Sequence, residues 1–173
     1  MEGLRFLLSV MLVMIAALVQ TSVFHSIRPF GASPDVVLLM VVVGVVWLKP
    51  EAAVLLGFLG GLLLDLLGSA PLGLSGLAFT VGSYITVRSR DRFNYGLPVG
   101  VITVGGITLV TLVTNALVGT LFGEGTLGNP DIIRTLLLVP IYNMVFALGL
   151  LPLADRLFSW VAGPRHRWVR SGL

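Results

Sequence analysis

The sequence predicts an all-α, polytopic membrane protein, and its composition is the first reason. Of the 173 residues, 56% are hydrophobic and only 11% are charged, well below the roughly 25% of charged residues in typical soluble domains. The mean hydropathy of the chain is +1.01. A soluble fold of this length has no interior large enough for so much apolar surface, whereas a bilayer solvates it.

Six apolar segments, separated by charged or turn-forming residues, predict six transmembrane helices. Arg5 precedes the first segment and no small-x-small cleavage site follows, so we expect an uncleaved anchor. Pro34-Asp35 and Pro50-Glu51 are helix-start signals for the second and third segments. No linker or soluble domain remains, so residues 1–173 are expected to form one transmembrane domain, with helices at about 6–26, 34–48, 50–67, 72–88, 95–122 and 132–157.

The second and third segments are short for a membrane. Because a helix rises ~1.5 Å per residue, residues 34–48 span only about 22 Å of a ~30 Å hydrocarbon core. A re-entrant hairpin would instead place Lys49 and Glu51 at mid-membrane, at about 3 kcal/mol each. We therefore expect two short full spans, with Lys49 snorkelling and Trp47 at the interface.

Positive charge predicts the orientation of the six spans. If both termini face the cytoplasm, nine of the eleven basic residues lie inside, and only Arg28 and Arg134 lie outside. The positive-inside rule therefore favours an N-in, C-in topology. The inside residues are Arg5, Lys49, Arg88, Arg90, Arg92, Arg156, Arg165, Arg167 and Arg170.

The remaining composition argues against most chemistry. The chain has no cysteine, so it predicts no disulfide and no cysteine metal site. Its net charge of +3 is typical of cytoplasmic loops of a membrane protein, and nucleic acid is not an expected partner. No phosphate-binding loop, nucleophile elbow or zinc signature is present. We expect no catalytic residue, no cofactor and no metal.

A stripe of small residues marks the third segment. Ala53, Gly57, Gly61 and Asp65 are four residues apart, so they lie on one face of a helix, where the glycines allow close backbone approach. The stripe is compatible with packing against another helix of the chain or with docking of a partner's transmembrane helix. We expect Asp65 to be an interfacial carboxylate.

Other polar side chains lie within the apolar segments. In hydrocarbon, such groups usually form hydrogen bonds between helices, and this interpretation is favoured over a substrate or ion pathway. These residues are Gln20 in the first segment, Thr108, Thr111 and Asn115 with Gly119 in the fifth, and Tyr142 and Asn143 in the sixth.

Three runs follow one another in the first half of the chain: Pro34-Asp35-Val36-Val37-Leu38-Leu39, Gly57-Phe58-Leu59-Gly60-Gly61-Leu62-Leu63-Leu64-Asp65 and Gly68-Ser69-Ala70-Pro71-Leu72-Gly73-Leu74-Ser75. In this order and spacing they resemble the rod shape-determining protein MreD family. Gln20-Thr21-Ser22 and Gly31 fit the same pattern. The specific part of the resemblance covers about residues 20–75, and beyond Arg88 it rests on hydropathy and Asn143.

The resemblance implies a non-catalytic scaffold in the bacterial inner membrane. MreD-like proteins belong to the cell-elongation machinery that supports peptidoglycan synthesis and cell shape. The implied partner is MreC, a single-pass membrane protein, and through it RodA, a penicillin-binding protein and MreB, with the lipid bilayer around the chain. The positions implied for partner binding or helix packing are Gln20, Pro34, Asp35, Gly57, Gly61, Asp65, Pro71, Gly73 and Asn143.

An alternative of another class is the substrate-binding membrane subunit of an energy-coupling-factor vitamin transporter, which also has six helices. Such subunits typically carry an alanine-x-x-x-alanine pattern in the first helix. Here Ala16 and Ala17 are followed by Gln20 and Thr21, so the pattern is missing. Residues 123–129 also lack the aromatic side chains that a vitamin site favours.

Overall fold

The computed structural model describes residues 2–24, 32–68, 70–128 and 130–162. Some residues named in the expectations above lie outside the described residues: Arg28, Gly31, Ser69 and the tail residues Arg165, Arg167 and Arg170. Within those ranges every regular element is a helix and there is no strand, which confirms the all-α class. The elements are α1 (Glu2–Val19), a π-helical turn η1 (Gln20–Phe24), α2 (Val36–Val45), α3 (Pro50–Leu67), α4 (Leu74–Arg88), a 3-10 turn η3 (Arg90–Asn94), α5 (Leu97–Leu121), a 3-10 turn η4 (Thr126–Gly128) and α6 (Ile132–Ala162).

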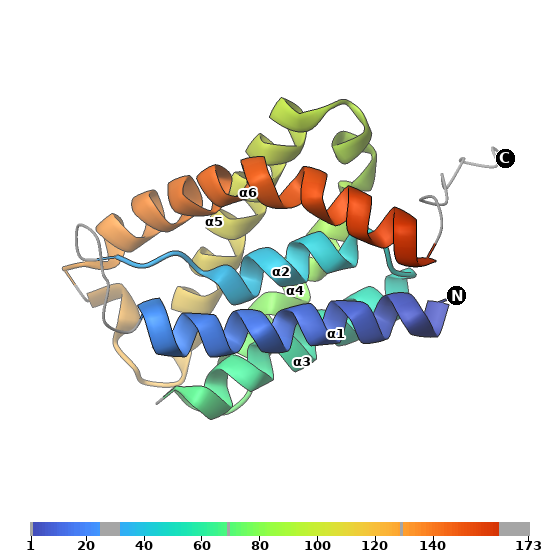
Figure 1. Ribbon diagram of the computed structural model, residues 1–173. Helices are drawn as coiled ribbons and strands as arrows, with labels where there is room; N and C mark the ends of the chain where they lie inside the picture. The colour runs from blue at the N-terminus through green and yellow to red at the C-terminus, as the bar shows by residue number, and fades with distance from the viewer. Residues whose placement is uncertain (1, 25–31, 69, 129, 163–173) are drawn as a thin grey trace, which may run out of the picture.

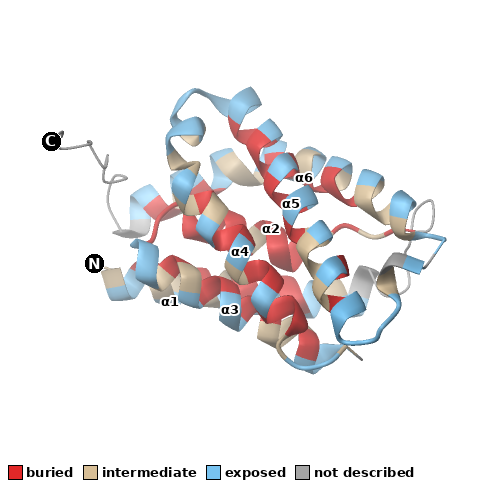
Figure 2. Cartoon of the chain, turned by 180° about the vertical axis from the view of Figure 1, so that it is seen from behind, coloured by how far each residue is buried: buried red, intermediate tan, exposed pale blue. Residues whose placement is uncertain are grey.

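Helix α2 lies at the centre of the bundle. Nine of its ten residues are buried, and it contacts α1, α3, α4, α5 and α6. Figure 1 shows α2 between α1 and α6, with α4 behind it. Seen from the other side in Figure 2, buried residues concentrate on α2 and on the inward faces of α4 and α5. A helix that is apolar all round belongs in such a core.

The outer surface of the bundle is apolar. On α1, for example, Leu7, Met11 and Leu18 are 61%, 59% and 62% exposed. A soluble protein rarely leaves contiguous apolar patches of this kind in contact with water, whereas lipid covers them without cost. Together with the long apolar helices, this surface makes the chain a multi-pass membrane protein.

In the part of the chain that the structure describes, four helices are long and apolar enough to cross a membrane, and they cover Glu2–Ser22, Pro50–Leu67, Leu97–Leu121 and Ile132–Trp160. The other two expected spans form helices that are shorter than their apolar segments in the sequence. Helix α2 has 10 residues and α4 has 15, which correspond to about 15 Å and 22 Å. Six helices therefore lie near the six expected positions. The lengths of α2 and α4 do not by themselves establish that these two helices cross the membrane.

Two side chains named in the sequence expectations are buried within the bundle. Trp47, expected at the membrane interface, is 6% exposed and stacks on Phe158 of α6, with ring centroids 5.2 Å apart. Arg5, expected to precede the first helix, lies within it, because α1 begins at Glu2, and its side chain is buried.

Candidate functional site

The first group of candidate residues lies at the start of α2. Asp35 is the N-cap residue, and its Oδ1 accepts a hydrogen bond from the Leu38 N–H at 3.0 Å. Gln20, from the π-helical turn at the end of α1, accepts from the Val37 N–H at 3.0 Å. Its side chain also hydrogen-bonds to the Asp35 carboxylate. Pro34 is buried directly before the cap. These contacts satisfy amides that the first turn of a helix leaves without partners.

Asn143 joins this group from α6. It is completely buried, and its Nδ2 donates to the Asp35 carbonyl oxygen and to Thr108 Oγ1, each at 3.2 Å. Its Oδ1 has no hydrogen-bond partner among the described residues. The amide thus links α6, α5 and the chain entering α2. We call Gln20, Asp35, Thr108 and Asn143 the α2 cap cluster.

The opposite end of α2 is held by Arg90. This side chain extends from η3 and donates from Nη2 to the Val45 carbonyl oxygen at 2.7 Å and to the Leu48 carbonyl oxygen. A guanidinium at a helix C-terminus satisfies open carbonyls and interacts favourably with the helix dipole. The sequence expectation counted Arg90 only as a cytoplasmic charge. A contact across 42–45 residues of chain leaves no periodic signal in the sequence.

The second group lies between α3 and α4. A Cβ at Gly57 would lie 2.7 Å from the Phe79 carbonyl oxygen, and one at Gly61 would lie 2.6 Å from the Gly76 amide nitrogen. Both distances are too short for a real Cβ, so these positions require glycine for the two helices to approach. The glycine face of α3 is therefore occupied by α4 of the same chain and is not open to a partner helix.

Asp65 completes this group and is 3% exposed. It accepts hydrogen bonds from the N–H groups of Gly73 at 2.9 Å and Ser75 at 3.1 Å. A carboxylate is thus the cap of α4, although it belongs to α3. Gly73 has a φ of +93°, which a residue with a side chain rarely adopts. The sequence predicted an interfacial carboxylate at Asp65; in the structure the start of α4 covers this side chain.

Helix α5 adds one contact to this second group. Asn115 Nδ2 donates to Ser75 Oγ at 3.3 Å, so this polar side chain of the fifth helix contacts α4, whereas Thr108 contacts α6. Thr111 is also buried, and its hydroxyl donates to the carbonyl oxygen of Ile107 in its own helix. Pro71 lies exposed in the turn before α4. We call Gly57, Gly61, Asp65, Gly73 and Ser75 the α3–α4 seam.

The nine candidate residues thus divide between two places in the fold. Gln20, Pro34, Asp35 and Asn143 meet at the start of α2, while Gly57, Gly61, Asp65, Pro71 and Gly73 meet at the α3–α4 seam and its turn. The side chains that the sequence did not single out are Arg90 and Ser75. Among the described residues, no three His, Cys, Asp or Glu side chains are grouped so that they could hold a metal ion.

The fold and these two clusters define a class: a multi-pass helical membrane protein whose buried polar groups hold helix ends and helix seams. The family described as rod shape-determining protein MreD matches residues 2–160, nearly the whole chain. The chain belongs to the MreD family, and it is a rod-shape-determining membrane protein. This is a family of structural membrane proteins and not a known enzyme family. Neither the curated proteins nor the solved structures gave a match, and nothing here supports the vitamin-transporter alternative.

Proposed function

We propose that the chain is a non-catalytic scaffold that holds an MreC-like single-pass partner in the bacterial inner membrane. Through that partner it would reach RodA, a penicillin-binding protein and MreB, and so support peptidoglycan synthesis during elongation. One observation carries the proposal beyond the family match. The buried polar side chains of the α2 cap cluster and the α3–α4 seam bond to helix ends and to neighbouring helices, which is the chemistry of a rigid support.

The proposed partner contact lies on the outward side of α3, next to the turn that follows Asp65. The glycines of α3 are covered by α4, so a partner helix would pack on the opposite ridge, where Leu55 and Leu59 are 49% and 41% exposed. Association of helices in lipid depends on close van der Waals packing. Shortening two leucines of this ridge should therefore weaken the complex.

The test is affinity purification of the tagged protein from native membranes, with MreC measured in the eluate and normalised to the bait. The double variant Leu55→Ala/Leu59→Ala should recover several-fold less MreC than the wild type. The matched control Leu7→Ala/Met11→Ala shortens two exposed side chains of α1 and should recover the wild-type amount. Equal recovery with both variants would remove α3 from the contact. No MreC with the wild type would reject the function.

The proposal includes six spans with both termini inside, on the strength of the nine-to-two split of basic residues. Since the chain has no cysteine, single cysteines report the topology directly. In intact cells, Ser89→Cys and Arg170→Cys should be protected from an impermeant thiol reagent, and Glu124→Cys should be labelled. The reverse pattern would overturn the orientation.

A further inference from the structure

A groove lies where the start of α5 meets the C-terminal half of α6, beside η3. Its volume is about 200 Å³, which is smaller than the ~300–1,000 Å³ of a pocket for a drug-sized molecule. Three elements line it: η3 contributes Phe93 and Asn94, α5 contributes Leu97, and α6 contributes Leu151, Pro152 and Asp155. We call this cavity the α5–α6 groove. Its size is suited to a small polar group and not to a whole ligand.

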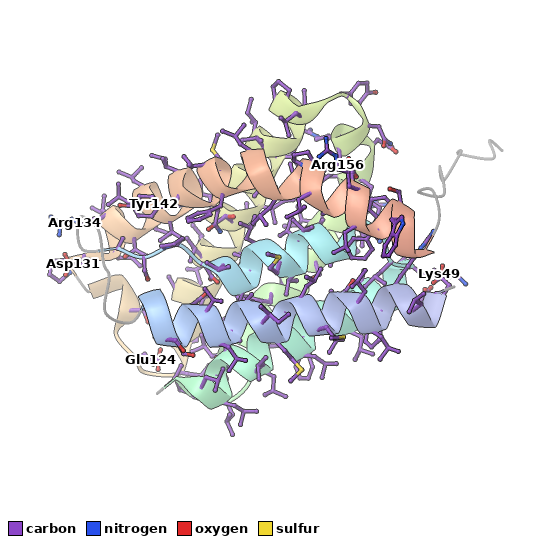
Figure 3. All side chains as sticks on the ribbon, viewed as in Figure 1. Lys49, Glu124, Asp131, Arg134, Tyr142 and Arg156 are labelled. Atoms are coloured by element: carbon purple, nitrogen blue, oxygen red, sulfur yellow. The ribbon has the colours of Figure 1, made fainter. Side chains whose placement is uncertain are left out.

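The α5–α6 groove lies at one of the two water boundaries of the membrane. The turn η3, which forms one of its walls, carries exposed Asp91 and Arg92, and the long apolar helix α5 begins directly after it. In Figure 3, Arg156 lies toward the end of the molecule that carries Lys49 and away from the end that carries Glu124. Phospholipid headgroups occupy this depth of a bilayer.

Two oxygen acceptors on α6 favour a cation in the groove. Asp155 lines it, and a carboxylate can accept from several donors at once. Pro152 lines it one turn closer to the middle of α6. Because proline has no N–H, the carbonyl oxygen of Leu148 lacks the donor that residue 152 would normally provide. A carboxylate and a backbone carbonyl oxygen together suit an ammonium group.

Arginine side chains on both walls favour an anion beside that cation. Arg92 lies in η3 next to a lining residue, and Arg156 follows Asp155 in α6; both are exposed. Arg88 is also exposed just before η3, so the exposed basic side chains of this stretch outnumber its one acidic side chain, Asp91. Guanidinium groups bind phosphate through paired hydrogen bonds. The groove thus combines charges of both signs.

Apolar surface continues from the groove along both helices. Leu97 at its edge is 42% exposed, and further from the boundary Ile102 on α5 and Leu148 on α6 are 65% and 51% exposed. Acyl chains of a lipid cover such surfaces in a bilayer. A soluble zwitterion would use the charges of the groove but not this apolar continuation, so the whole surface fits a lipid better.

We propose that the α5–α6 groove binds a zwitterionic phospholipid with a primary amine, of which phosphatidylethanolamine is the example. The ammonium donates to the Asp155 carboxylate and the Leu148 carbonyl oxygen, the phosphate lies between Arg92 and Arg156, and the acyl chains cover α5 and α6. A primary ammonium has three N–H donors, whereas the quaternary ammonium of a choline headgroup has none and a glycerol headgroup has no positive charge. The proposal leaves all six spans in place and depends neither on MreC nor on which terminus faces the cytoplasm.

Native mass spectrometry of the purified, delipidated full chain tests the proposal. The chain is titrated with phosphatidylethanolamine, phosphatidylcholine and phosphatidylglycerol that carry the same palmitoyl and oleoyl chains. We expect several-fold more bound phosphatidylethanolamine than either other lipid. Asp155→Asn should lower its binding to the level of phosphatidylcholine. The matched control Glu51→Gln removes an exposed carboxylate at the start of α3 and should bind all three lipids as the wild type does.

A second variant tests the phosphate side of the groove. Arg92→Gln/Arg156→Gln should lower the binding of all three lipids several-fold, because they share the phosphate, and should keep their order. Circular dichroism and a single elution peak establish that each variant is folded. If Asp155→Asn does not fold, the arginine variant decides, and wild-type binding by it would overturn the proposal.

Three other results would also overturn the proposal. Equal binding of the three lipids by the wild type would mean that they only coat the apolar surface. A preference for phosphatidylglycerol would mean that the arginines act without Asp155, as would a folded Asp155→Asn protein that still prefers phosphatidylethanolamine. The absence of any bound lipid would leave the groove to a protein segment.

Discussion

Asp35 and Asp65 both cap one of the two shortest α-helices of the bundle, but they reach their partners across different lengths of chain. Asp35 accepts from Leu38, three residues further along and within the helix that it begins. Asp65 accepts from Gly73 and Ser75, which are eight and ten residues away and lie at the start of the next helix. The first carboxylate completes one helix end, whereas the second ties two helices together.

This difference has a consequence for stability. Loss of the Asp35 cap leaves α2 surrounded by five helices and still contacted by Gln20 and Asn143. Loss of Asp65 leaves the amides of Gly73, Ser75 and Gly76 without this acceptor at the point where the α3–α4 hairpin closes. We therefore expect equivalent substitutions to have larger effects at the seam than at the α2 cap.

The largest effect is expected for Asp65→Leu. This variant removes the acceptor of the Gly73 and Ser75 amides, and a buried donor without a partner costs about 1–3 kcal/mol. Asp65→Asn keeps one acceptor oxygen and should be milder. Thermal unfolding of the purified protein in detergent measures both. If the two variants unfold at the same temperature, the charge of Asp65 matters and its role as an acceptor does not.

The next effect concerns the glycine face. Gly61→Leu would force α3 and α4 apart, and overpacking of this kind costs about 1–3 kcal/mol. Gly106→Leu is the matched control, because a Cβ at Gly106 has no atom within 4 Å. We expect lower unfolding temperature and lower membrane abundance for Gly61→Leu only. Equal behaviour of the two variants would mean that α3 and α4 do not pack closely at Gly61.

A smaller loss is expected at the α2 cap. Asp35→Ala removes one local cap, which typically costs about 1 kcal/mol. Asn143 contacts the carbonyl oxygen of Asp35 and not its side chain, so this contact survives the substitution. The unfolding temperature should fall by less than in Asp65→Leu. An equal or larger fall would remove the distinction between the two carboxylates.

The smallest effect is expected to have the opposite sign. Ser83 faces Gly57 in the contact between α3 and α4, and its hydroxyl is buried without a hydrogen-bond partner among the described residues. Ser83→Ala removes this polar group and should be neutral or stabilising by up to about 1 kcal/mol. A measurable fall in unfolding temperature would show that the hydroxyl has a partner.

The same contrast explains what the sequence could predict. Local signals were sufficient for the helices: Pro50 does lie at the start of α3, and Asp35 does cap α2. The four-residue spacing of Gly57 and Gly61 also placed them on one face. The identity of the facing helix was not predictable, because periodicity describes one helix and not its neighbour.

Contacts between distant segments leave no local pattern in the sequence, so they could not be predicted from it. Nothing in the local pattern assigns Arg90 to the carbonyl oxygens of Val45 and Leu48, or turns Asn143 toward Asp35. The stacking of Trp47 could not be predicted for a related reason. Its sequence position at the end of an apolar run is typical of an interfacial tryptophan, but Phe158, more than a hundred residues later, provides a buried stacking partner.

The central position of α2 has a consequence for the order in which the protein is made. This helix leaves the ribosome early, yet the side chains that close its two ends come later, Arg90 from η3 and Asn143 from α6, the latter 108 residues after Asp35. Five other helices also surround it. A nascent chain that ends before α6 therefore holds its most apolar helix without its final neighbours, so the centre of the bundle is completed only when synthesis is almost finished.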